Sequence, residues 1–278
     1  MANVQVQNPQ LSGQVLYYRQ PELLSKELHG KLGVNPSPTR FSFAAGHHLC
    51  PLTVQEFSAA STCYPIIFVG ENYDPVAVMG VNDEKNLFTT PELGFDVDTY
   101  IPAFIRRYPF VLAQPNPGTV DPAMADRMLV GIDRGYEYIA ENAQYPFFNE
   151  NGEPSDYTNR CMQFCNDFEA QAQSTRQFVD LLKGLDLMEK RTTTYQPQNQ
   201  DGSPAGDPQP VAEYYGVSEE KLRALPADKL AEMVVNGAMQ QIYAHLNSLF
   251  AWDKLLARHI QRFTAEEQTA AANAPANA

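Results

Sequence analysis

The run Tyr100–Phe110 constrains the fold more than any other stretch, because it sets two adjacent arginines among four aromatic side chains. Aromatic side chains bury about 150–250 Å² each, so this run needs a core or a partner surface. Neighbouring positions on a helix are separated by about 100° around its axis, so one of Arg106 and Arg107 should face inward and the other outward. A buried guanidinium is costly alone, and Asp133 or Glu56 is the carboxylate expected to hold it.

The same run separates two segments that share an order of parts. Each has a helix, a strand that opens with Tyr-Pro at Tyr64 or Tyr108, and a loop. Each then has an apolar strand whose Gly is followed two residues later by Asn or Asp, and an aromatic closing element. This order predicts a duplicated unit over residues 53–90 and 97–150. Convergent strand and turn patterns would produce the same order, and they remain the alternative.

The short apolar runs between turn signals predict an α+β fold, with an antiparallel sheet and short helices followed by a helical C-terminal part. We expect an N-terminal arm with one short helix over residues 1–30 and the α+β body over 31–155. Within the body, the alternation of Phe41–Ala45 indicates a strand. Thr53 is a candidate N-cap for a helix over residues 54–60.

Beyond residue 155 the apolar side chains recur at steps of three and four, which predicts a long core helix over 156–190. Cys161 and Cys165 share a face of this helix with phenylalanines, so we expect packed thiols rather than metal ligands. Residues 191–212 hold four prolines and few large apolar side chains, as a linker or loop does. C-terminal helices are expected over 213–263 and a disordered tail over 264–278.

Charge and hydropathy exclude several classes of protein. The formal net charge of −13 over 278 residues argues against nonspecific binding to nucleic acid or to an anionic membrane. No apolar run reaches the roughly 18–20 residues that span a bilayer. The N-terminus shows no export signal, so we expect a cytoplasmic protein whose four cysteines are reduced.

The sequence shows no motif that defines a reaction. It has no Gly-x-Ser-x-Gly elbow, phosphate-binding loop, dinucleotide fingerprint or His-Glu-x-x-His. His47-His48-Leu49-Cys50 is the densest group of candidate metal ligands, yet adjacent side chains of an extended segment point to opposite faces. We therefore predict no metal and no cofactor.

Several short motifs together resemble the SapC family over about residues 15–262. They are Phe41-Ser42-Phe43-Ala44, Glu56-Phe57, Tyr64-Pro65-Ile66-Ile67-Phe68, Asn86-Leu87-Phe88, Tyr100-Ile101-Pro102, Arg106-Arg107-Tyr108-Pro109-Phe110, Gly131-Ile132-Asp133, Gly152-Glu153-Pro154 and Tyr243-Ala244-His245-Leu246-Asn247. The family is named for a link to surface-layer systems, and its members often lie near genes for outer-membrane receptors and flavin-dependent halogenases. The resemblance implies an accessory role and no defined chemistry. A membrane permease for peptides bears the same name, and this chain without spans does not resemble it.

Two functional hypotheses compete. The preferred one is an accessory or adaptor protein of a surface-layer or envelope uptake system, binding a protein or peptide partner. Its candidate binding residues are Arg106, Arg107, Tyr108, Tyr64, Glu56, Asp133 and Tyr100. The alternative is an unrecognised enzyme on a small or peptidyl substrate, with an arginine clamping a carboxylate and Glu56 or Asp133 as general base. Convergence of the arginines and the acids around a deep pocket would favour the enzyme, and a flat aromatic surface the adaptor.

Overall fold

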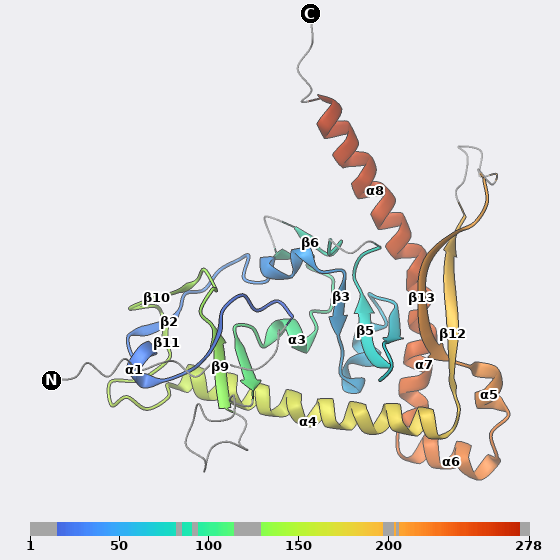
Figure 1. The fold of residues 1–278 in the computed structure, drawn as a ribbon, viewed down its shortest axis with the longest axis horizontal. Coiled ribbons are helices and arrows are strands. Elements are labelled where there is room, and N and C mark those ends of the chain that lie inside the picture. The colour runs from blue at the N-terminus through green and yellow to red at the C-terminus, as the bar shows by residue number, and fades with distance from the viewer. Residues whose placement is uncertain are drawn as a thin grey trace, which may run out of the picture. The chain divides into compact units, whose positions relative to one another are not determined.

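The computed structural model describes residues 16–81, 85–90, 94–113, 129–196, 203 and 206–272. The chain forms two compact units. The first takes Met1–Phe43 and Phe104–Ala170, and the second takes Ala44–Ala103 and Gln171–Ala278. The fold is α+β, as expected, with antiparallel strand pairs, short helices and a helical C-terminal part (Figure 1).

The first unit is built on two small antiparallel sheets. One has the order β1-β9-β8, and the other β10-β2-β11. The strands are β1 (Pro21–Leu23), β2 (Leu32–Val34), β8 (Phe110–Ala113), β9 (Leu129–Asp133), β10 (Ile139–Glu141) and β11 (Tyr145–Pro146). The helices are α1 (Lys26–His29), α3 (Ala103–Arg106), which begins at the unit boundary, and the part of α4 (Asp156–Gly184) up to Ala170.

The core of the first unit is aromatic. Phe110, Ile132 and Phe147 are almost fully buried, and Tyr108 and Cys165 pack in the same cluster. Phe110 meets Phe147 edge to face at a centroid distance of 5.7 Å, a favourable geometry for aromatic pairs. The run that opened the sequence analysis therefore does lie in a core.

The second unit holds a five-stranded antiparallel sheet with the order β12-β13-β4-β5-β3. Its strands are β3 (Leu49–Pro51), β4 (Ile66–Val69), β5 (Asp74–Val78), β12 (Met188–Tyr195) and β13 (Gln209–Val217), and a separate pair is β6 (Thr89–Thr90) with β7 (Gly94–Phe95). Its helices are η2 (Val54–Glu56), α2 (Phe57–Ala60), α5 (Glu219–Arg223), α6 (Ala227–Val235), α7 (Ala238–Ser248) and α8 (Ala251–Ala272).

A buried histidine helps to join helix α7 to the sheet of the second unit. His245 is fully buried and lies between β4 and β13, with Nδ1 2.8 Å from the Ile66 oxygen. Its Nε2 lies 3.1 Å from the Val217 nitrogen. The ring therefore connects the helix to two strands.

The prediction of a strand at Phe41–Ala45 is wrong. The chain forms a 3-10 helix, η1 (Ser42–Gly46), at this place. Phe41 and Phe43 gave the alternating pattern, but the following Ala44, Ala45 and Gly46 lack the branched or aromatic side chains that favour strands. The helix expected after Thr53 is present as η2 and α2.

The prediction of a linker or loop over 191–212 is wrong at both ends, because residues 191–195 belong to β12 and residues 209–212 to β13, and these strands pair (Figure 1). Thr192, Thr193 and Thr194 are β-branched and favour a strand. Pro210 lies where the register shifts between Thr193 and Thr194, a place where a strand tolerates proline.

Three further expectations concern the ends of the chain and α4. Helix α4 begins at Asp156 as expected but ends at Gly184 and not at residue 190, because residues 188–190 already belong to β12. Helix α8 continues to Ala272, so the tail expected from residue 264 is helical over most of its length, consistent with its alanines and glutamates. Residues 1–15 of the expected arm and residues 273–278 of the tail lie outside the described residues. Within the described residues, no helix has the length and apolarity needed to cross a membrane.

The internal repeat stays a prediction. In each segment a four-residue helix precedes the Tyr-Pro pair, and the strand that follows pairs antiparallel with the next one along the chain. The hydroxyls differ, because that of Tyr64 donates to the Tyr100 oxygen and that of Tyr108 donates to Asp133. The predicted turn at Asn82 lies outside the described residues.

Candidate functional site

The carboxylate of Asp133 is a structural hub of the first unit. Asp133 ends β9 and is fully buried. Its Oδ2 accepts hydrogen bonds from the Arg19 backbone N–H and the Tyr108 hydroxyl, both at 2.8 Å. Its Oδ1 accepts from the backbone N–H groups of Gln20 at 2.8 Å and Gly135 at 2.9 Å. The expected ion pair between Asp133 and a buried arginine is therefore wrong: neutral donors fill both oxygens.

Glu56 has the same arrangement in the second unit. Its Oε2 accepts from the backbone N–H of Thr53 at 2.9 Å and from the Thr53 hydroxyl at 2.8 Å. Its Oε1 accepts from the Tyr100 hydroxyl at 2.9 Å and from the Ala103 N–H at 2.6 Å. Tyr64 is a core residue of this unit, and burial raises the pKa of its hydroxyl. Glu56, Tyr64 and Tyr100 thus hold the second unit together.

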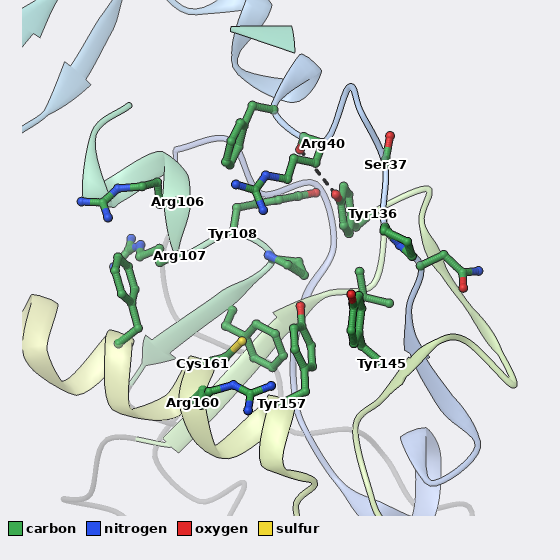
Figure 2. Close-up of a pocket in the computed structure, with 17 residues that line it drawn as sticks. Ser37, Arg40, Arg106, Arg107, Tyr108, Tyr136, Tyr145, Tyr157, Arg160 and Cys161 are labelled. Carbon is green, nitrogen blue, oxygen red and sulfur yellow. Dashed lines mark hydrogen bonds between the residues drawn. The ribbon is translucent and has the colours of Figure 1, made fainter. Parts of the chain in front are cut away.

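The first unit contains a pocket with a volume of about 390 Å³, which we call the Arg–Tyr pocket (Figure 2). Its described lining residues include four arginines and neither aspartate nor glutamate. The arginines are Arg40, Arg106, Arg107 and Arg160, and the tyrosines are Tyr108, Tyr136, Tyr145 and Tyr157. Loop residues after β2, helix α3, strand β8 and helix α4 each contribute part of this lining.

Arg107 is the buried cation of the pocket, with 7% of its surface exposed. Its Cζ lies 4.1 Å from the ring centre of Phe104 and 4.7 Å from that of Phe168. Arg106 is exposed, and its Cζ lies 5.3 Å from the ring centre of Phe164. The prediction that one arginine turns inward and the other outward is confirmed.

The charge of Arg107 is only partly compensated. In the part of the chain that the structure describes, its buried Nε has no hydrogen-bond partner. The Tyr18 hydroxyl lies beside the guanidinium: burial raises the pKa of Tyr18, and the charge of Arg107 partly offsets this. A phenol is neutral and supplies no counter-charge. A buried polar group without its hydrogen bond is costly, so the Nε marks a place where an acceptor would be stabilised.

The tyrosines form an aromatic wall. The rings of Tyr145 and Tyr157 stack, with centres 5.2 Å apart and an interplanar angle of 22°. The ring of Tyr108 meets that of Tyr136 edge to face at 4.9 Å. Burial raises the pKa of the Tyr136 and Tyr157 hydroxyls, so both remain protonated near neutral pH.

Of the seven candidate residues from the sequence, the pocket brings together Arg106, Arg107 and Tyr108. Asp133 is bonded to Tyr108 but is not among the described lining residues. Sequence reasoning missed Arg40, Tyr136 and Tyr145, which come from separate segments of the chain.

The contribution of α4 to the pocket had a signal in the sequence. Tyr157, Arg160, Cys161 and Phe164 are spaced at three, four and seven residues and all line the pocket. Reading this face as core was right for Cys165, which is buried, but Cys161 is only partly buried and lines the pocket. An arginine and a tyrosine at helical spacing were the sign that this face is not all core.

The structure thus defines an α+β protein with an arginine-lined pocket. The chain belongs to the SapC family, whose model matches residues 24–255. No curated protein and no solved structure shows a significant match. Among the described residues, no group of three or more His, Cys, Asp or Glu side chains is placed to hold a metal ion.

Proposed function

We propose that this SapC-family protein is an accessory protein that holds an acidic group of a protein or peptide partner in the Arg–Tyr pocket. The observation that carries the proposal is the gathering of four arginines, with no acidic side chain among the described lining residues. The whole chain has a formal net charge of −13, so the positive charge of the pocket lining contrasts with the negative charge of the chain. Local concentration of one sign of charge attracts ligands of the opposite sign.

The buried Arg107 supports the same proposal. A guanidinium presents a planar fork of donors that matches a carboxylate, and such charge-assisted hydrogen bonds are about twice as strong as neutral ones. Interactions of this kind are screened least where water is excluded. The exposed Arg40, Arg106 and Arg160 would mainly attract and orient the ligand.

A binding role is better supported than catalysis. Neutral donors occupy both oxygens of Asp133 and of Glu56, so neither carboxylate is available as a general base. Burial raises the pKa of the Cys161 thiol, which disfavours the nucleophilic thiolate. The described pocket lining therefore offers cations and neutral phenols to a ligand, and no base.

The partner belongs, in this proposal, to a surface-layer or envelope uptake system. The link of the SapC family to surface-layer systems supports this part. The pocket is the feature by which such a partner would be recognised.

The proposal is tested with a pair of peptides that differ only in charge. The first is an immobilised peptide of alternating Asp, Glu and Phe with a free C-terminal carboxylate. The second carries Asn, Gln and a C-terminal amide instead. We expect the protein to bind the acidic peptide more tightly, and to bind it less at high ionic strength. Equal binding of the two peptides would contradict the proposal.

Matched variants locate the binding on the protein. Arg160→Ala removes an exposed arginine of the pocket and should weaken binding of the acidic peptide. Arg134→Ala removes an exposed arginine of the same unit that does not line the pocket, and should leave binding unchanged. An equal loss in both variants would indicate general charge attraction instead of a site.

A further inference from the structure

We infer that the Arg–Tyr pocket recognises the C-terminal carboxylate of a peptide whose last residue is aromatic. The inference rests on the proposed function and names the ligand of that site. It comes from two sides of the pocket: a cationic side with Arg106 and Arg107, and an aromatic side with the tyrosines, near which Arg40 and Arg160 also lie. Figure 2 shows Arg106 and Arg107 on one side of the pocket and Tyr136 and Tyr145 on the other.

The cationic side selects a planar acid. The rings of Phe104 and Phe168 lie close to Cζ of Arg107 and hold its guanidinium by cation–π contacts. Arg107 also lines the pocket, so a ligand there would meet its side chain, whose buried Nε has no hydrogen-bond partner among the described residues. A carboxylate accepts two parallel hydrogen bonds from the planar fork of an arginine, so an acid is the ligand that suits this side of the pocket.

The aromatic side selects a ring. Tyr145 stacks on Tyr157 and keeps 36% of its surface exposed, so an aromatic group of a ligand could extend the stack or meet its edge. Arg160, which lines the same pocket, adds a cation for a ligand ring to pack against. Acidic peptides without a ring would leave this side of the pocket unfilled.

The size of the pocket favours a chain end. Its volume of about 390 Å³ is near the lower limit of the about 300–1,000 Å³ typical of ligand pockets. An internal acidic residue would require the peptide to enter and leave the pocket, whereas a C-terminal residue enters once. At a C-terminal aromatic residue the carboxylate and the side chain leave the same carbon atom, so both reach the pocket together.

Calorimetric titrations of the full chain test the inference. The probe is acetyl-Gly-Gly-Phe with a free carboxylate, compared with its C-terminal amide and with acetyl-Gly-Gly-Ala as the acid. We expect the amide and the alanine peptide each to bind about tenfold more weakly or worse, the loss expected for a charged hydrogen bond or a buried ring. Phenylacetate has a phenyl ring and a carboxylate but no peptide group, and it should also bind more weakly than the phenylalanine peptide.

Two variants assign the two sides of the pocket. Tyr145→Ala removes a partly exposed ring and should weaken binding of the phenylalanine peptide. The weak binding of the alanine peptide should stay unchanged. Arg107→Lys should reduce the preference for the acid over the amide, and Arg134→Ala should change neither. If Arg107→Lys does not fold, the acid and amide pair on the parent protein still decides the question.

The outcomes separate this inference from the proposed function. Equal binding of the acid and the amide overturns the inference, even if the longer acidic peptide binds. Equal binding of the phenylalanine and alanine acids overturns the aromatic part. Phenylacetate that binds as tightly as the peptide would make a small aromatic acid the ligand and overturn the peptide part. Failure of every acidic probe overturns the proposed function as well.

Discussion

Acidification should destabilise the second unit through His245. The ring is fully buried in α7, and a neutral imidazole with its proton on Nδ1 fits both neighbours. Nδ1–H would donate to the Ile66 oxygen and Nε2 would accept from the Val217 N–H. Burial lowers the pKa of His245 to about 4, since a charged ring would lose its water. Protonation would also place a second N–H against that of Val217.

The size of the effect follows from the difference in pKa between the folded and unfolded chain. The unfolded value is about 6.5, so between about pH 6.5 and 4 the unfolded chain binds a proton that the folded chain does not. Stability therefore falls as the pH falls through this window. The loss at this residue is about 2 kcal/mol near pH 5 and about 3 kcal/mol near pH 4, at 1.36 kcal/mol per pKa unit.

The assay compares the parent with His245→Gln in urea at about pH 7.5 and pH 5. Glutamine does not titrate, so the parent's advantage in unfolding free energy should shrink by about 2 kcal/mol on acidification. Trp252 is the single tryptophan, is buried in α8 of the same unit, and reports its unfolding by fluorescence. Leu222→Ala is the control, because it removes a buried apolar side chain without titrating and should show the same deficit at both pH values.

The reasoning would be refuted if the parent exceeded His245→Gln in unfolding free energy by the same amount at both pH values. It would mean that the imidazole carries the same charge in the folded and unfolded chain. The burial and the two neighbours of His245 would then not control its protonation.

Five substitutions in the first unit test its packing, each by urea unfolding followed by circular dichroism. Asp133→Asn places an amide NH₂ against two of the four donors and should lower the unfolding free energy by about 2–4 kcal/mol. An unchanged urea midpoint would contradict the role of Asp133 as a structural hub. Arg107→Lys loses the planar contact with two rings and should cost about 1–3 kcal/mol, while the exposed Arg106→Lys should cost little, and equal effects would be inconsistent with their burial. Cys165→Ala should cost about 1–2 kcal/mol and Cys161→Ala less, because only Cys165 is fully buried; the reverse order would refute this.

Local geometry explains what the sequence could predict about the arginines. The angle between neighbouring positions on a helix separates Arg106 from Arg107 regardless of the rest of the fold. The partner of the inward arginine was not predictable in this way. The Asp133 carboxylate is taken by backbone groups at Arg19 and Gln20, which lie more than a hundred positions earlier in the chain.

Proline misled the interpretation of residues 191–212 for a related reason. Counting prolines treats each as a break, but Pro210 lies at a register shift, where the pairing of β12 with β13 is irregular in any case. Whether a proline ends a strand depends on which of its groups face a neighbour. That is a property of the pairing and not of the local sequence.

The Arg–Tyr pocket depends on what the carboxylates do elsewhere. Had Asp133 paired with Arg107, the pocket would have lost this buried guanidinium to an internal ion pair. Instead, four neutral donors satisfy Asp133, and the Nε of Arg107 is left without an acceptor in the described structure. Removing one partner of a buried ion pair is costly, because the remaining charge is uncompensated. A ligand carboxylate would remove that cost on binding, and by linkage it would stabilise the folded first unit. The saturation of Asp133 is therefore the feature that leaves this pocket open to an anion.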